Sequence, residues 1–119
     1  MYHNQEIGKI GEDITLKYLE SCGYKLITRN CNLKVSEIDL IMRSSSGIIH
    51  FIEVKTGMIG GKFIFDNLSA KKRHKLARAV ELYITKHRIT QFQTDFAFVK
   101  LNMASRIGSV EMMWNQILE

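Results

Sequence analysis

Two β-rich runs around a serine- and glycine-rich turn constrain the fold of this chain more than any other feature. Residues 37–42 and 48–55 are rich in isoleucine, leucine, valine and phenylalanine, and residues 44–47 between them have the sequence Ser-Ser-Ser-Gly. Runs of this length and composition are typical of strands, and the serine and glycine cluster is typical of a tight connection. The pattern therefore predicts an antiparallel β-hairpin.

Charged side chains interrupt this apolar hairpin at related positions. Because side chains alternate between the two faces of a strand, Glu53 and Lys55 share one face. A turn centred near Ser46 places Asp39 directly opposite Glu53, where opposed Cβ atoms lie about 5 Å apart and like charges destabilise the pair. Burying two facing carboxylates costs free energy unless a cation or a hydrogen-bond donor compensates.

A divalent metal ion removes this conflict. Mg²⁺ or Mn²⁺ is commonly held by one or two carboxylates, so we expect Asp39 and Glu53 to be metal ligands, with the Val54 carbonyl as a further oxygen. The ammonium group of Lys55 is placed to orient or deprotonate a water molecule and to neutralise charge on a phosphate. The residues therefore predict a site for phosphodiester hydrolysis.

Glu12 is a further candidate for this site. In a helix it falls on the flank of the apolar face, between Leu16 and Leu19, from which it can point along the helix–sheet boundary toward the hairpin. Two alternatives remain open at this point. Glu53 and Lys55 also suit a solvent-facing edge strand, and Glu12 also suits an ordinary solvated helix position.

The remaining elements give the order α-β-β-β-α-β-β. Apolar periodicity predicts helices over residues 5–21 and 70–86, the second with Ser69 as N-cap and Leu68 packing back on its first turn. Further strands are expected at residues 24–29, 95–101 and 107–113, with a loop over 56–67 and a tail over 114–118. We therefore predict one α/β domain over residues 1–119, a mixed sheet flanked by helices.

Positive charge is concentrated on the second predicted helix. The whole chain carries a formal charge of +5, whereas residues 69–88 contain seven lysines and arginines against the single acid Glu81. The candidate nucleic-acid-binding residues are Lys71, Lys72, Arg73, Lys75 and Arg78. Such a local basic surface favours a polyanionic partner, nucleic acid before an anionic membrane, although a solvated helix face is the alternative. DNA is expected before RNA as that partner.

Other features bear on location and on thiol chemistry. No apolar run is long enough to cross a membrane, and the first residues lack the organisation of a signal peptide, so a cytoplasmic protein without a membrane partner is expected. Cys22 and Cys31 are expected to be buried structural thiols rather than a disulfide or a zinc site.

Three groups of residues, taken together, resemble a known family. They are Gly8-x-x-Gly11-Glu12 with Tyr18, Leu19, Gly23, Tyr24, Ile27 and Asn30; Glu37-Ile38-Asp39-Leu40-Ile41 with Phe51-Ile52-Glu53-Val54-Lys55-Thr56; and Lys72-x-x-x-Leu76 with Ala79 and Tyr83. They resemble the signatures of the YraN-type proteins, small bacterial members of the PD-(D/E)XK, or restriction-endonuclease-like, superfamily. The resemblance covers nearly the whole chain.

The resemblance implies a restriction-endonuclease-like αβββαβ core and a catalytic triplet of Asp39, Glu53 and Lys55. It also implies that Glu12 completes the metal site. The chain departs from the family pattern where Ser36 replaces a glycine, where Gly57 replaces an arginine, and where Gln93-Thr94-Asp95 replaces Arg-Phe-Asp. Two expected anion-binding arginines are therefore absent.

These observations lead to two functional hypotheses. The first is a Mg²⁺- or Mn²⁺-dependent endonuclease that hydrolyses DNA, with branched or structured DNA as a candidate substrate; an enzyme that cuts both strands is expected to act as a symmetric homodimer. The alternative is a non-catalytic nucleic-acid-binding or adaptor module that retains the nuclease fold.

Overall fold

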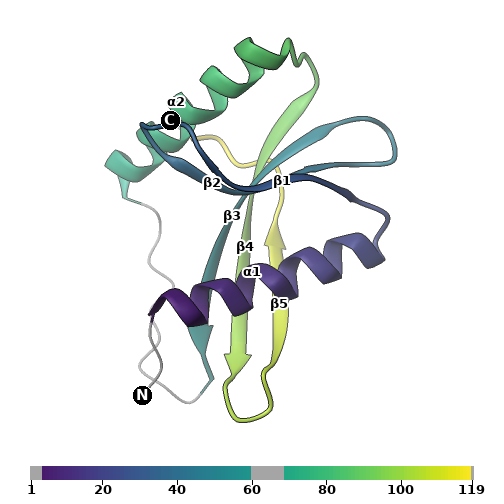
Figure 1. The fold of residues 1–119 in the computed structure, drawn as a ribbon, viewed down its shortest axis with the longest axis vertical. Coiled ribbons are helices and arrows are strands. Elements are labelled where there is room, and N and C mark those ends of the chain that lie inside the picture. Colours follow the sequence, from purple (N-terminus) through teal and green to yellow (C-terminus); the bar gives the residue numbers. More distant parts are fainter. Residues whose placement is uncertain (1–3, 60–68, 119) are drawn as a thin grey trace.

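The computed structural model describes residues 4–59 and 69–118, which form two helices and five strands in the predicted order (Figure 1). The elements are α1 (Asn4–Ser21), β1 (Lys25–Asn32), β2 (Glu37–Arg43), β3 (Ile49–Met58), α2 (Ala70–His87), β4 (Phe92–Asn102) and β5 (Ile107–Met113).

The five strands form one mixed sheet in the order β1-β2-β3-β4-β5. The β1–β2, β2–β3 and β4–β5 pairs are antiparallel, whereas β3 and β4 are parallel. Parallel neighbours cannot be joined by a tight hairpin, and the connection between β3 and β4 contains α2. The predicted α/β class and the αβββαβ core order are therefore confirmed.

Two apolar clusters pack on opposite faces of the sheet. Phe51 of β3 packs with Leu76, Val80 and Tyr83 of α2, whereas the next residue, Ile52, packs with Leu19 of α1. Because consecutive residues of a strand point to opposite faces, α2 covers one face and α1 the other. By the same alternation, Glu53 and Lys55 belong to the face that α2 covers.

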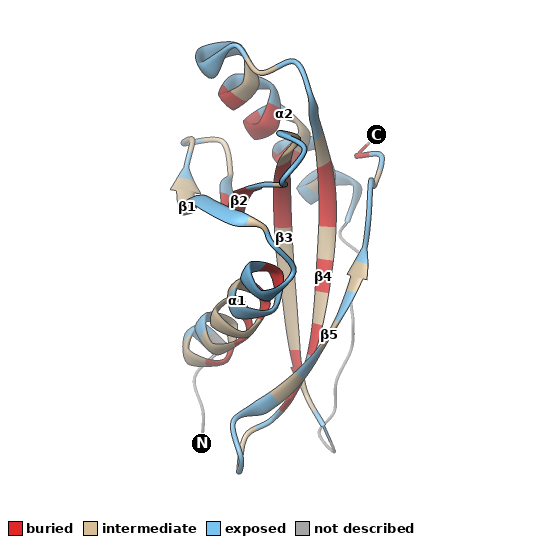
Figure 2. Cartoon of the chain, turned by 90° about the vertical axis from the view of Figure 1, so that its right-hand side faces the viewer, coloured by how far each residue is buried: buried red, intermediate tan, exposed pale blue. Residues whose placement is uncertain are grey.

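The hairpin of β2 and β3 has the predicted register, but its ladder is short. The paired residues run from Arg43↔Ile49 to Leu40↔Ile52, which is the register that sets Asp39 opposite Glu53. Beyond Ile52 the ladder ends, and β3 continues to Met58 alongside β4. Figure 2 shows β1 and β2 turned away from the long β3–β4 pair. We call this divergence of β2 from β3 the fork.

Several predicted boundaries differ from the observed ones. β1 extends to Asn32 rather than residue 29 and has an irregularity between Leu26 and Thr28. β3 continues through residues 56–58, predicted as loop, because its pairing with β4 outlasts its pairing with β2. Residues 60–67 of the predicted loop and Leu68 lie outside the described residues. Ser69 is the N-cap of α2 as predicted, and its hydroxyl accepts the Lys72 amide at 3.2 Å.

The two cysteines depart partly from expectation. Both are free thiols, as predicted, but Cys22 is exposed and Cys31 is only half-buried, so the prediction of two buried thiols is wrong. Cys22 follows the last residue of α1 and precedes the turn at Gly23, where the chain leaves the core. Within residues 4–59 and 69–118, neither helix combines the length and apolarity that a membrane span requires.

Candidate active site

Asp39 lies at the fork, where its side chain accepts a hydrogen bond that the backbone ladder of β2 and β3 no longer makes. Its Oδ2 atom accepts a hydrogen bond from the backbone amide of Val54 at 2.8 Å, so a side chain takes the place of a backbone partner. The amide and carbonyl of one residue in an extended strand point to the same edge. The Val54 carbonyl therefore also lies on the edge of β3 that faces Asp39.

Glu53 shares this fork with Asp39. Burial raises the pKa of Glu53 well above its ordinary value of 4.5, and a hydrogen bond with the Asp39 side chain and the negative charge of Asp39 raise it further. A hydrogen bond that raises a pKa is one that the protonated acid donates. Without a cation, burial and Asp39 therefore favour the neutral, protonated form of Glu53 at physiological pH. We call these two residues the acid pair.

Lys55 stands two residues beyond Glu53 on the same face of β3 and is half-buried. Its positive charge lowers the pKa of Glu53, against the larger effects of burial and of Asp39. Alternation along β3 sets Lys55 on the same face as Glu53, and its action on a molecule bound at the acid pair stays a prediction.

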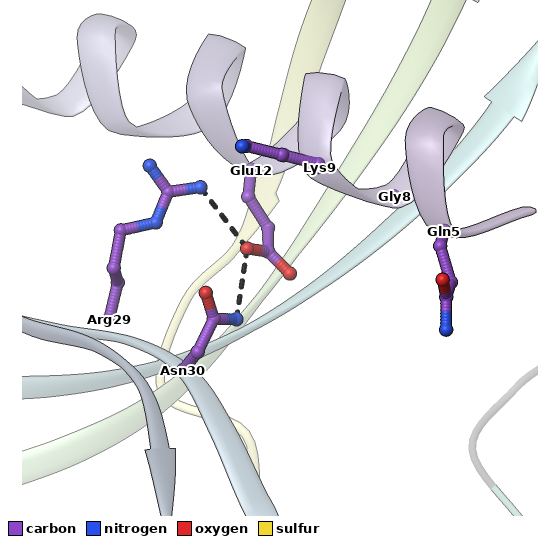
Figure 3. A pocket seen from close by; sticks show the side chains of 6 residues that line it. All are labelled: Gln5, Gly8, Lys9, Glu12, Arg29 and Asn30. Atoms are coloured by element: carbon purple, nitrogen blue, oxygen red, sulfur yellow. Dashed lines mark hydrogen bonds and ion pairs between the residues drawn. The ribbon is translucent and has the colours of Figure 1, made fainter.

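Glu12 projects from α1 toward Arg29 and Asn30 of β1, as Figure 3 shows. Its Oε1 atom accepts hydrogen bonds from Arg29 at 3.2 Å and from Asn30 at 3.0 Å, both on β1, and the side chain is 15% exposed. Burial raises the pKa of Glu12, hydrogen bonds from Asn30 and Arg29 lower it, and the charge of Asp39 raises it. Glu12 is therefore not an ordinary solvated helix residue.

Glu12 does not join the acid pair in one cluster. Among the described residues, no three acidic, histidine or cysteine side chains lie close enough together to hold one metal ion. Glu12 belongs to α1, which covers the opposite face from Glu53, and its carboxylate is directed to β1. The acid pair by itself suits Mg²⁺ or Mn²⁺, because both are hard cations that take carboxylate and carbonyl oxygens. The role of Glu12 as a third ligand stays a prediction.

Close packing of α1 on β3 explains the glycine before Glu12. A Cβ atom at Gly11 would collide with the side chain of Thr56, whereas a Cβ atom at Gly8 would meet nothing within 4 Å. The Thr56 hydroxyl is buried and has no hydrogen-bond partner among the described residues. Gly11 thus allows the helix that carries Glu12 to approach the strand that carries Glu53.

Arg29 and Asn30 were not predicted as site residues. Arg29 also pairs with Asp13, at 2.8 Å, and Asn30 donates to Glu37 as well as to Glu12. Asn30 has a positive φ of 51°, a conformation that asparagine tolerates better than most residues. The sequence offered one signal: adjacent acids on a half-buried helix flank require a cation, and Arg29 lies on the next strand.

A second buried polar cluster was also missed. His50 Nδ1 lies 2.6 Å from Asp95 Oδ2, and Asp95 Oδ1 accepts from the Gln93 side chain at 2.8 Å and from the Asn115 amide at 2.9 Å. His50 and Asp95 are both buried, and the ring of Trp114 lies against His50. A polar residue inside the apolar run of residues 48–52 was the signal that a buried partner exists.

The basic residues predicted on the second helix lie on the first half of α2. Lys71, Lys72, Lys75 and Arg78 are exposed, and Arg73 is half-buried. Within the described part of the chain, none of the five forms an ion pair with an acidic side chain. Their positive charge is therefore available to an external partner.

Fold and site together define an α/β protein with a half-buried acid pair where two strands of a mixed sheet diverge. The family model described as "Uncharacterised protein family UPF0102" matches residues 11–110, and the chain belongs to this family. A UPF0102 protein of Dehalococcoides mccartyi is 30% identical over 119 residues, covering 99% of this chain and 98% of the relative. One from Clostridium botulinum strain Hall is 34% identical, covering 96% and 95%.

Two solved structures show weaker likeness to the chain. One, described as a complex of EndoMS with double-stranded DNA, has a TM-score of 0.45 and 15% identity, covering 71% of this chain and 34% of the EndoMS chain. The other is SfsA from Pyrococcus furiosus in complex with Ca²⁺, with a TM-score of 0.40 and 14% identity, covering 94% of this chain and 62% of SfsA.

Proposed function

We propose that this protein is a divalent-metal-dependent endonuclease that hydrolyses phosphodiester bonds in DNA. The observation that carries the proposal is the acid pair, in which Asp39 and Glu53 stand at opposed positions of the fork and burial and Asp39 raise the pKa of Glu53. A divalent cation held by both carboxylates would compensate both negative charges at once.

Asp39 and Glu53 would hold the ion, together with the Val54 carbonyl on the same edge of β3. Asp39 is fixed by the Val54 amide, which leaves its other oxygen for the metal. When bound, such an ion supplies Lewis-acid stabilisation of the phosphate and lowers the pKa of a bound water. For Glu12 to be a third ligand, its carboxylate must leave Arg29 and Asn30 and turn toward Asp39.

Lys55 would act on the reacting water and phosphate from the same face as Glu53. In this role the ammonium group orients the attacking water and stabilises the negative charge that develops on the phosphate oxygens. The positive charge of Lys55 also opposes the effect of Asp39 on the pKa of Glu53.

The basic residues of α2 support a nucleic acid as the substrate. α2 covers the face of the sheet to which Glu53 and Lys55 belong, and its exposed lysines and Arg78 have no acidic partners among the described residues. Such side chains contact phosphates and fix the position of a duplex without reading its sequence. DNA is the expected substrate, and cutting both strands would require a symmetric dimer.

A cleavage assay tests this proposal. Labelled duplex, single-stranded and four-way-junction DNA, with RNA of matched sequence, are incubated with the protein in Mg²⁺, Mn²⁺ or chelator. We expect metal-dependent cleavage that falls at least about 100-fold in Asp39→Asn and in Lys55→Gln. The matched controls are Glu111→Gln and Lys100→Gln, exposed residues of β5 and β4 that should retain activity.

Two outcomes would contradict hydrolysis. One is the absence of cleavage with every metal and substrate, and the other is cleavage that survives Asp39→Asn. Metal-independent DNA binding without cleavage would support the non-catalytic binding module instead. Sedimentation of the protein with and without duplex DNA tests the proposed dimer, and a monomer in both conditions would overturn it.

A further inference from the structure

An open pocket lies between α1 and β1. It has a volume of about 570 Å³ and is lined by Gln5, Gly8, Lys9, Glu12, Arg29 and Asn30 (Figure 3). Asn30 of this pocket donates hydrogen bonds to Glu12 at 3.0 Å and to Glu37 at 3.2 Å, and Glu37 stands two residues before Asp39 on β2. The pocket therefore lies beside the strand that carries Asp39.

Arg29 is held in place and still has donors to offer. Glu12 and Asp13 fix its guanidinium group at 3.2 and 2.8 Å. These bonds use two of the five N–H donors of arginine, which leaves three for a ligand. A guanidinium group that is fixed before binding loses less entropy when it meets a planar or tetrahedral anion.

Lys9 supplies a second positive charge to the same pocket. It is exposed and forms no ion pair within the described residues, and one turn earlier on the helix Gln5 adds an uncharged amide. The two cations Lys9 and Arg29 are balanced by Glu12 and by Asp13, which binds Arg29 from beside the pocket. The unused guanidinium donors, the Lys9 ammonium group and the amides of Gln5 and Asn30 suit a ligand with several acceptor oxygens rather than an apolar one.

We propose that this pocket binds a backbone phosphate of the DNA strand next to the phosphate at the acid pair, with Arg29 and Lys9 as its ligands. This proposal rests on the proposed function for the identity of the substrate. The pocket supplies anion-binding side chains from α1 and β1, whereas the family arginines that Gly57 and Gln93 replace would have come from β3 and β4. A phosphate held in this pocket would fix the position of the DNA strand relative to the acid pair.

The test measures binding rather than cleavage. Fluorescence anisotropy of a labelled DNA duplex is recorded in chelator over a series of salt concentrations for the wild-type protein, Arg29→Gln and Lys9→Gln. Each lost phosphate contact should make the slope of log affinity against log salt shallower by about one and weaken binding several-fold. Lys9→Gln alters an exposed side chain, so it remains informative if Arg29→Gln fails to fold.

Matched controls separate a pocket from a general charge effect. Lys17→Gln removes an exposed lysine of α1 outside the pocket, and Arg106→Gln removes an arginine that pairs with Glu6 of the same helix. A salt dependence of binding that becomes shallower only in the pocket variants supports the site. A salt dependence that is unchanged in the pocket variants, or that becomes equally shallow in the controls, overturns it.

The same samples distinguish failure of the pocket from failure of hydrolysis. If DNA binding depends on the pocket residues but the protein cleaves no substrate, the phosphate site is supported and the nuclease proposal is overturned. If the protein cleaves DNA but the pocket variants have the salt dependence of wild type, the nuclease proposal is supported and the phosphate site is overturned. A wild-type protein that does not bind duplex DNA overturns both.

Discussion

The Val54 amide donates a hydrogen bond to Asp39 Oδ2 at 2.8 Å, so a carboxylate closes the ladder where β2 leaves β3. Asp39 therefore has two separable effects on stability: its oxygen accepts the hydrogen bond from the Val54 amide, and its negative charge stands opposite Glu53. In chelator at neutral pH, Asp39→Ala should lower the free energy of unfolding by about 1–3 kcal/mol, because the partly buried Val54 amide loses its acceptor. Asp39→Asn keeps an acceptor and should stabilise the metal-free protein, because it removes the charge opposite Glu53. Urea unfolding measures both, and equal losses in the two variants would contradict the arrangement.

Glu53 should make the metal-free protein less stable as pH rises. Its folded-state pKa lies above the ordinary 4.5, so the unfolded chain releases its proton first. The stabilising contribution is complete below pH 4.5 and is lost as pH rises toward the folded-state pKa, by at most about 1.4 kcal/mol per pH unit. Glu53→Gln should flatten this slope and raise stability at neutral pH. Denaturant unfolding in chelator at several pH values measures the slope, and a Glu53→Gln variant as pH-sensitive as wild type would refute the assignment.

Divalent ions should stabilise the folded protein through the acid pair. A ligand that binds only the folded state at a hundredfold excess over its Kd adds about 2.7 kcal/mol. We expect Mg²⁺ or Mn²⁺ to raise the melting temperature of wild type but not of Glu53→Gln or Asp39→Asn. Titration calorimetry gives the stoichiometry directly. Unchanged metal binding in both variants would place the ion elsewhere.

Two glycines of α1 should respond oppositely to alanine. Gly11→Ala forces a Cβ atom into Thr56 of β3, and we expect a loss of at least about 2 kcal/mol from overpacking. Gly8→Ala meets no neighbour within 4 Å and should stabilise the helix by up to about 1 kcal/mol. Thermal unfolding of the two variants compares them directly. A tolerated Gly11→Ala would mean that α1 does not pack on β3 as closely as observed.

The buried His50–Asp95 contact should be a structural requirement rather than a part of the site. Asp95 accepts from His50, Gln93 and the Asn115 amide, and an asparagine presents an NH₂ group where one of these donors stands. Asp95→Asn should therefore cost about 1–3 kcal/mol. The control Glu6→Gln breaks the exposed pair with Arg106 and should cost less than about 1 kcal/mol. Urea unfolding tests this, and comparable losses in the two variants would contradict it.

Much of the sheet could be predicted from local patterns. Alternation and turn residues set the hairpin register, so that Asp39 and Glu53 were expected at opposed positions. Strand ends were less predictable, because they depend on neighbours distant in sequence. β3 outlasts the predicted residue 55 because β4 continues beside it, and β1 outlasts residue 29 because β2 pairs with it as far as Asn32.

The candidate site also has one part that local sequence patterns predict and one part that depends on the tertiary fold. The acid pair comes from one hairpin and follows from spacing, whereas the partners of Glu12 come from β1 and required the fold to be known. Arg29 and Asn30 meet Glu12 across 17 and 18 residues of sequence. No periodicity within a single element indicates such a meeting. The His50–Asp95 contact, across 45 residues, was hidden for the same reason.

The pairing of Leu40 with Ile52 has a consequence for how the chain selects one structure. A slip of this hairpin by one residue would turn Ile52 toward the α2 core and Phe51 toward the α1 core, and it would separate Glu53 from Asp39. Two differently shaped cores and one pair of carboxylates therefore specify the same register. An ion that binds both carboxylates would add its binding energy to that register alone. Metal binding would then favour the native pairing of β2 and β3 over the shifted one, besides serving the reaction.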